Sequence, residues 1–515
     1  MGRWHYSGRL AAVVMVGILA FAALASSRAA SSGVDHASTN ANAALFRATY
    51  RAIADHYLKP LTPQKLAMTG LARLADIDSS LAVSHDDNDV VLRQWRHVIW
   101  RHAAPAPGNA AAWGRLTATL LDIARRYSGD VLAQPPNAID TAVIDGSLGL
   151  LDRFSRYAPP VQATEHRDSR DGYGGIGVTL ERDGDGVRIA MVMPNSPAAG
   201  AGLDGGDAIT AINGTATRTL SPGAIAARMR GRIGSTLDLT VVREEGSYPV
   251  TIMLRRAHIV VRSVALRELG QVAALRVSSF NARTADELAA ALALAHRDMG
   301  TRLRGLVLDL RDNPGGLVDQ AVRVASMFLD HGLVVSTIGR VPESNQIFDV
   351  TRDRPAERLP LVVLVNGGSA SASEIVASAL QDDHRAIIVG TSSYGKGTVQ
   401  DVIGLPNNGE LTVTWAKLIP PGGYILHHHG VVPVVCTDGV KRVAAAVPVP
   451  GVPRAGLSNR GWIALRAQCP PMRIDRPIDL KIAERLLLSP ARYVRALADE
   501  PAKPIQAAAA NIPMR

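Results

Sequence analysis

The strongest constraint on the fold is a run of apolar residues that ends in two glycines. Leu361 to Val365 is apolar throughout and rich in β-branched side chains, which is typical of a strand buried on both faces of a parallel sheet. The glycines, Gly367 and Gly368, predict a tight turn, and the small residues after them predict a helix that opens near Ser371. A second strand is predicted from Ala386 to Val389.

Strand and helix patterns alternate from His258 onward. Val272 to Phe280 has the composition of a strand, and Thr284 to Glu287 fits the capping box that opens a helix. The segment GLVLDLR, residues 305–311, predicts a further apolar strand, and a helix is expected from Gly315 to Leu329. Alternation of this kind predicts an α/β core with a mainly parallel sheet.

A serine and a lysine are candidates for a catalytic pair. Ser371 lies at the predicted start of a helix, where unpaired backbone N–H groups and the helix dipole stabilise a nucleophile or an oxyanion. A serine hydroxyl needs a base, and Lys396, between Gly395 and Gly397, can act as one if desolvation favours its neutral amine. If the following segment is extended, Gln400 shares a face with Lys396 and can orient the amine.

Two other interpretations of these residues are open. Ser371 to Glu374 also fits a capping box, in which the serine has only a structural role. Gly390 to Lys396 fits the G-x-x-x-x-G-K pattern of a phosphate-binding loop, which continues with Ser or Thr and a helix. Because Gly397 and a predicted strand follow here, we do not expect nucleotide binding.

Three motifs connect this part of the chain to a known family. The segments SASASE (residues 369–374), YGKGTVQ (394–400) and LDLRDNPGG (308–316) resemble the carboxyl-terminal processing proteases, the tail-specific Ser/Lys peptidases of family S41. The resemblance covers about residues 145–435. It implies a ClpP/crotonase-like α/β protease core, which we place at residues 259–435.

The same resemblance implies a role for individual residues. Ser371 would be the nucleophile, Lys396 the general base and Gln400 the residue that orients the base. The implied oxyanion hole, which donates to the charge on the scissile carbonyl, consists of backbone N–H groups of Ala372, Gly315 and Gly316. Which of the two glycines donates stays open, and no metal or cofactor is implied.

A block over residues 172–256 resembles a PDZ domain. Tyr173 to Val178 is a glycine-rich loop before a predicted strand, and SPAAGAGL (196–203) and GDAITAING (206–214) follow in the order typical of that domain. Loop amides can hold a terminal carboxylate, and an exposed strand edge accepts an extended peptide. The resemblance implies substrate-binding roles for Gly174, Gly175, Ile176, Gly177, Val178 and Arg230.

The N-terminus has the pattern of an export signal. Arg3, His5 and Arg9 precede an apolar run, Leu10 to Ala25, and small residues follow at Ser27 to Ala29. We therefore expect residues 1–30 to be a signal peptide or an anchor to the inner membrane, and the protein to lie in the periplasm or cell envelope. No cysteine lies near this run, which argues against a lipoprotein.

The regions that flank the predicted protease parts have less distinctive patterns. Apolar residues at helical spacing predict a helical N-terminal domain over residues 44–160. After the core we expect a C-terminal extension, residues 436–515, with one amphipathic helix at Leu480 to Leu488 and a disordered Ala- and Pro-rich tail.

Three other groups of reactive side chains invite a chemical interpretation. Asp309 and Asp312 could form a carboxylate pair, although strand alternation does not guarantee that they converge. Three consecutive histidines, His427 to His429, cannot all reach one ion from an extended segment, so we expect a solvated turn or a rim rather than a metal site. Cys436 and Cys469 are expected to pair in an oxidising compartment.

These features predict an exported serine endopeptidase that cuts proteins after its PDZ domain recognises their C-terminal or unfolded segments. The alternative from another class is a catalytically silent PDZ scaffold or adaptor. Expected partners are protein or peptide substrates bound by their C-termini, a second copy of the chain or an adaptor protein, and a membrane at the N-terminus. The net charge of +10 is spread without a block of basic residues, so nucleic-acid binding is not expected.

Overall fold

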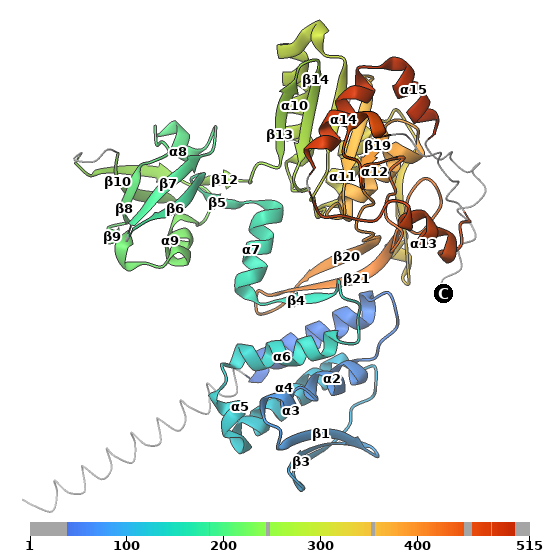
Figure 1. Cartoon of the computed structure of the whole chain (residues 1–515). Helices are drawn as coiled ribbons and strands as arrows, with labels where there is room; N and C mark the ends of the chain where they lie inside the picture. The colour runs from blue at the N-terminus through green and yellow to red at the C-terminus, as the bar shows by residue number, and fades with distance from the viewer. Residues whose placement is uncertain are drawn as a thin grey trace, which may run out of the picture. The chain divides into compact units, whose positions relative to one another are not determined.

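The computed structural model describes residues 39–184, 186–243, 248–351, 356–446, 456–474 and 476–499. The predicted signal or anchor of residues 1–30 and the tail beyond residue 499 lie outside the described residues. The chain divides into two compact units, Met1–Ala163 with Gln400–Trp415 and Thr164–Val399 with Ala416–Arg515 (Figure 1). Within the described part, no helix combines the length and the apolar character needed to cross a membrane.

The first unit contains the helices that the sequence predicted. After a helix over residues 39–56 come α2 (Pro63–Leu71), α3 (Leu74–Ile77), α4 (Ala110–Tyr127), α5 (Gly129–Ala133) and α6 (Pro136–Leu148). Their apolar faces enclose a core in which Phe46, Tyr50 and Trp113 are fully buried.

A small antiparallel sheet that was not predicted from the sequence interrupts these helices. Its strands are β1 (Leu81–Asp86), β2 (Asp89–Gln94) and β3 (His97–Ala103), paired in chain order. Asp87 and Trp95, in the two hairpin turns, have φ of 53° and 54° without being glycine. Because glycine is the usual sequence marker for such turns, the hairpins were not apparent and the segment was wrongly predicted to be helical.

The predicted PDZ block forms a sheet with two helices. The strand order is β11-β10-β8-β7-β6, with β9 (Thr215–Ala216) paired to β8. The main strands are β6 (Val178–Asp183), β7 (Gly186–Val192), β8 (Ala208–Ile212), β10 (Thr236–Val242) and β11 (Val250–Arg255). Helices α8 (Pro197–Gly200) and α9 (Pro222–Met229) lie in the same block, and β5 (Tyr173–Gly175) pairs with β12 (Ala257–Ile259) at its ends. Strand β6 is left at an edge of the sheet, so one side of it can accept another strand.

The central sheet of the second unit is mainly parallel, as predicted. Its order is β13-β14-β15-β18-β19-β22, and only the β13–β14 pair is antiparallel. The strands are β13 (Val264–Leu269), β14 (Val272–Val277), β15 (Gly305–Asp309), β18 (Leu361–Val365), β19 (Ile387–Gly390) and β22 (Val435–Cys436). The predicted boundaries of β18 agree with those in the structure.

Helices cover both faces of this sheet. In β18, Leu361, Val363 and Val365 belong to the apolar cluster shared with α10 (Thr284–Met299), α11 (Val318–Ser326) and α12 (Ala372–Asp382). The alternate residues, Val362 and Leu364, pack in a second cluster with α14 (Pro477–Leu487) and α15 (Pro490–Ala498) (Figure 1). Since successive side chains of a strand point to opposite faces, the continuous apolar run needs both layers, and the C-terminal extension supplies the second.

The C-terminal extension is more ordered than the sequence predicted. Besides α14, which matches the expected amphipathic helix, it contains α13 (Asn459–Ala467) and α15. A disulfide joins Cys436, in β22, to Cys469, just after α13. The expected pairing of the two cysteines is therefore present.

Two further long strands pass from one unit to the other, β20 (Thr398–Gly404) and β21 (Glu410–Ile419). Within the first unit, β4 (Arg156–Ala158) pairs with the Glu410–Thr412 end of β21. Within the second, β16 (Leu333–Gly339) pairs with β17 (Ile347–Asp349) and with the Ala416–Ile419 end of β21.

Candidate active site

The candidate catalytic residues of the second unit follow the carboxyl ends of neighbouring parallel strands. Gly315 follows β15, Ser371 follows β18 and Lys396 follows β19, and these three strands are adjacent in the sheet. The carboxyl edge of a parallel sheet is where such folds place their ligands. The parallel topology thus brings segments that are far apart in the sequence to one edge.

Ser371 has an unusual backbone conformation immediately before α12. Its φ is 55° and its ψ is −113°, a region that a residue with a side chain seldom adopts and that costs of order 1–3 kcal/mol. Ala372 is the first residue of the helix, and a backbone N–H at that position has no acceptor within the helix. The turn therefore places the Ser371 hydroxyl next to a donor that can stabilise an oxyanion.

Close packing explains why Gly315 must be a glycine. A Cβ at this position would lie 2.9 Å from the Cβ of Ser371 and 3.0 Å from the backbone nitrogen of Ala372. The φ of Gly315 is 101°, which also favours glycine. The LDLRDNPGG motif is thus in direct contact with the start of α12.

The structure distinguishes the two candidate donors of this motif. The N–H of Gly315 donates to Oδ1 of Asn313 at 2.9 Å. Gly316 forms a parallel bridge with Phe280, made by the carbonyl of Gly315 and the N–H of Leu317. In such a bridge the N–H of the central residue points away from the partner, so Gly316 is the better candidate to donate to an oxyanion together with Ala372.

Glu374 joins the serine segment to the lysine segment. It is fully buried, and its Oε2 accepts hydrogen bonds from the backbone N–H groups of Ser371, at 2.8 Å, and Lys396, at 2.9 Å. Its Oε1 accepts from the N–H of Gly395, at 2.7 Å, and from the hydroxyl of Ser393, at 2.5 Å. Burial raises the pKa of the Glu374 carboxyl, and these hydrogen bonds oppose that effect.

Only the contact of Glu374 with the serine segment has a sequence pattern that predicts it. The contact between Glu374 and the N–H of Ser371 was predicted by the capping-box pattern. The contacts with Ser393, Gly395 and Lys396 were missed, because they join α12 to a loop that follows a different strand.

The glycines beside Lys396 allow another segment of backbone to approach closely. A Cβ at Gly397 would lie 2.0 Å from the backbone nitrogen of His427, and one at Gly395 would lie 3.2 Å from the backbone of His428. The N–H of His428 donates to the carbonyl of Gly395 at 3.0 Å. The backbone of these histidines therefore passes against the lysine segment, which only glycines allow.

Gln400, the predicted orienting residue, belongs to the first unit. It lies in β20, and its side-chain amide donates to Oγ1 of Thr414 in β21 at 3.3 Å. The hydroxyl of Thr414 donates in turn to Asp152 at 3.0 Å. This chain fixes the amide within its own unit, and its role toward Lys396 stays a prediction.

The structure supports neither a phosphate-binding loop at Lys396 nor a carboxylate pair of Asp309 and Asp312. The segment after Lys396 is the strand β20, whereas a phosphate-binding loop needs a helix there. Asp309 accepts two hydrogen bonds from the side chain of Arg311, at 2.8 and 2.7 Å. Both residues are buried. Asp309 thus has a structural ion pair instead of forming a carboxylate pair with Asp312, whose backbone N–H donates to Asn366.

The three histidines form a turn, as predicted, and their rings have different neighbours. The rings of His427 and His428 lie 3.8 Å apart, whereas that of His429 stacks on Trp462 at 4.5 Å. Among the residues that the structure describes, no group of three or more His, Cys, Asp or Glu side chains has the arrangement of a metal site.

A groove of about 380 Å³ lies in the PDZ block between β6 and α9. Five of the six residues predicted to bind substrate line it, namely Gly175, Ile176, Gly177, Val178 and Arg230. Gly174 is not among the lining residues: a Cβ there would lie 2.0 Å from the carbonyl oxygen of Gly231. Arg230 forms an ion pair with Asp168 at 2.7 Å and lies over the ring of Tyr173.

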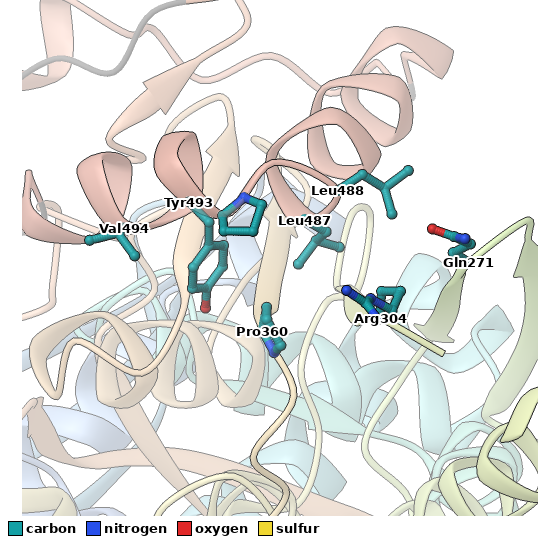
Figure 2. Close-up of a pocket in the computed structure, with 8 residues that line it drawn as sticks. Gln271, Arg304, Pro360, Leu487, Leu488, Tyr493 and Val494 are labelled. Carbon is teal, nitrogen blue, oxygen red and sulfur yellow. The ribbon is translucent and has the colours of Figure 1, made fainter. Parts of the chain in front are cut away.

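A second groove, of about 640 Å³, lies on the opposite edge of the central sheet. Figure 2 shows its lining residues, which include Gln271, Arg304 and Pro360 from the sheet side and Leu487 and Tyr493 from the C-terminal helices. The first three immediately precede β14, β15 and β18. This groove is therefore at the amino ends of the strands, away from Ser371.

Comparison with known proteins gives two family matches. The chain matches Peptidase family S41 over residues 271–435 and the PDZ domain over residues 174–254. The first range contains Ser371, Lys396 and both glycines of the candidate oxyanion hole.

Individual relatives match over more than half of the chain. A carboxy-terminal-processing protease of Bartonella bacilliformis is 39% identical over 297 residues, which is 57% of this chain and 68% of that protein. A CtpA-like serine protease of Staphylococcus aureus is 33% identical over 312 residues, 60% of this chain and 62% of that protein. Among solved structures, the photosystem II D1 C-terminal processing protease has 24% identity and a TM-score of 0.39, covering 76% of this chain and 92% of that one.

Proposed function

Because the chain belongs to peptidase family S41 and is a carboxy-terminal-processing serine protease with a PDZ domain, we propose that Ser371 and Lys396 carry out its chemistry. The observation that carries this assignment is the buried Glu374 carboxylate. One of its oxygens accepts hydrogen bonds from the backbones of both residues. The nucleophile and the base are thereby fixed to a common group.

The proposed reaction is acyl transfer to serine. Lys396, as the neutral amine, takes the proton of the Ser371 hydroxyl while the oxygen attacks the scissile carbonyl. The N–H groups of Ala372 and Gly316 stabilise the oxyanion of the tetrahedral intermediate. When the C–N bond breaks, the ammonium of Lys396 donates its proton to the leaving amine. Lys396 then activates the water that hydrolyses the acyl-enzyme.

The PDZ groove is proposed to deliver the substrate. A C-terminal peptide would pair with the free edge of β6, its carboxylate held by the amides of the Gly175 to Gly177 loop. The lining of the groove supports this assignment, since Ile176, Ile225 and Met229 offer an apolar surface to the last side chain. Unfolded proteins with an accessible C-terminus are the expected substrates.

We also propose that the enzyme works outside the cytoplasm. The basic and apolar pattern of residues 1–30 supports export to the periplasm or cell envelope. The Cys436–Cys469 disulfide supports it as well, because such bonds persist in oxidising compartments.

The test is cleavage of an unfolded protein by the purified enzyme, followed by intact mass spectrometry. Two substrates should be compared, identical except that one ends in a free carboxylate and the other in an amide. We expect cleavage that is lost in Ser371→Ala and that is slower for the amidated substrate. If the wild type neither cuts nor reacts with a fluorophosphonate, a catalytically silent PDZ scaffold becomes the better interpretation.

A further inference from the structure

A residue outside the family match contacts the lysine segment. Arg466 is on α13, in the C-terminal extension, whereas the family match ends at residue 435. Its Nη2 donates to the carbonyl of Ser393 at 3.0 Å, and its Nη1 donates to the carbonyl of His429. One guanidinium thus joins the segment that leads to Lys396 with the histidine segment that packs against it.

Arg466, Ser393 and Glu374 converge around Gly430. A Cβ at Gly430 would lie 2.6 Å from Nη1 of Arg466, 2.7 Å from the hydroxyl of Ser393 and 3.2 Å from Oε1 of Glu374. The φ of this glycine is 65°. A side chain at Gly430 would collide with these groups. Because glycine has none, the guanidinium of Arg466 and the carboxylate of Glu374 can both lie close to its backbone.

The charges of the two groups are complementary. Burial lowers the pKa of Arg466, and the nearby Glu374 raises it. Glu374 is fully buried, where an uncompensated carboxylate is costly. Among the residues that the structure describes around Gly430, Arg466 supplies the positive charge next to this carboxylate.

Helix α13 is fixed on both sides of Arg466. Trp462 is buried, and its ring stacks on that of His429. Cys469, three residues beyond Arg466, forms the disulfide with Cys436 at the end of β22. These contacts hold the guanidinium in place with little freedom, which favours a precise role.

We infer that Arg466 is a positioning residue of the catalytic site: it holds the loop that carries Lys396 and balances the charge of Glu374. This inference rests on the proposed roles of Ser371 and Lys396. The C-terminal extension then contributes to the geometry of the catalytic site, in addition to packing against the central sheet.

Removing the charge of Arg466 should change the protonation of Lys396. Without the guanidinium, the negative field of Glu374 favours the ammonium form of Lys396, so the neutral amine is populated only at higher pH. Other titratable side chains in this segment and in the turn packed against it are those of Tyr394, His427, His428 and His429. They are unchanged in Arg466 variants, so their contribution to a pH profile cancels in the comparison.

The experiment compares Arg466→Ala and Arg466→Lys with Arg460→Ala, an exposed arginine of the same helix. Steady-state cleavage of the unfolded substrate should be measured from pH 5 to 10 in the full chain, together with the thermal midpoint. For Arg466→Ala we expect kcat to fall about 10- to 100-fold with KM nearly unchanged, and the acid limb of the kcat profile to move to higher pH. Arg466→Lys should recover most of the pH shift, and Arg460→Ala should match the wild type.

Two outcomes would overturn the inference about Arg466 while leaving the proposed function intact. One is an active wild type with the same kcat and pH profile in Arg466→Ala. The other is an equal loss in Ala and Lys variants with an unmoved acid limb, which a merely structural arginine would give. A wild type that neither cuts nor reacts with a fluorophosphonate would overturn the proposed function, and the role of Arg466 with it.

Discussion

Ser371 and Lys396 donate their backbone N–H groups to the same atom, Oε2 of Glu374, at 2.8 and 2.9 Å. The two residues follow different strands of the central sheet, so no local structure relates them. A shared acceptor fixes one backbone relative to the other, as catalysis requires of a nucleophile and its base. Glu374 is therefore the residue on which the geometry of the pair depends.

Replacing Glu374 by glutamine should disrupt this geometry with little change in shape. The glutamine NH₂ would face N–H donors where the carboxylate now accepts, and buried donors left unpaired cost about 1–3 kcal/mol each. We expect kcat to fall at least about 100-fold and the thermal midpoint to decrease. Asp383→Asn, at the other end of α12, is the matched control, and wild-type kcat in Glu374→Gln would contradict the assignment.

The Lys396→Arg substitution tests the identity of the base. A guanidinium keeps the charge but does not lose its proton in the accessible pH range, so it cannot take the proton of Ser371. Losing a general base costs about 10²- to 10⁴-fold in rate. The measurement is kcat for the unfolded substrate beside the thermal midpoint, which should change little. Near-normal turnover in this variant would exclude the Ser/Lys mechanism.

The parts of the site that sequence could predict are those with local patterns. The apolar run of β18 has the predicted ends, because a strand buried on both faces has no polar residue until it leaves the sheet. The start of α12 at Ala372 follows from the capping box. The strand after Lys396 and the glycine-rich PDZ loop were likewise recognisable from their own residues.

The parts that sequence could not predict depend on contacts between distant segments. Nothing near Arg466 indicates that it would meet Ser393 and His429. The same holds for Arg311, whose buried guanidinium pairs with Asp479 of α14 at 3.3 Å. Both contacts come from the C-terminal extension, whose helices cover the second face of the sheet and could be placed only once the sheet was known.

The strained backbone of Ser371 predicts that glycine at this position makes the folded protein more stable than alanine does. A φ of 55° with a ψ of −113° strains any residue with a Cβ, whereas glycine adopts such angles readily. Ser371→Gly should therefore be more stable than Ser371→Ala by about 1 kcal/mol, although both lose activity. Denaturant unfolding of the two inactive variants measures the difference, and equal midpoints would show that the turn stores no strain.

The burial of Asp140 should make the stability of the first unit depend on pH. It lies on α6 with 7% of its surface exposed, and burial raises its pKa to about 6, with Arg125 opposing and Asp122 adding to the effect. Because the folded pKa is above that of the unfolded chain, its stabilising contribution is complete below about pH 4 and is lost as pH rises through about 6. At neutral pH the folded protein therefore contains a poorly compensated carboxylate.

Asp140→Asn removes that charge while keeping the shape of the side chain. At pH 3 the variant and the wild type should have similar free energies of unfolding, since Asp140 is then largely protonated in both the folded and the unfolded state. The difference should grow between pH 4 and 6 and level off at about 3 kcal/mol in favour of the variant above pH 7. Urea unfolding at four pH values, with the exposed Asp130→Asn as control, gives this profile. A variant less stable than the wild type at pH 8 would show instead that the carboxylate is compensated, and that the hydrogen bond from Asn42 to Asp140 outweighs its burial.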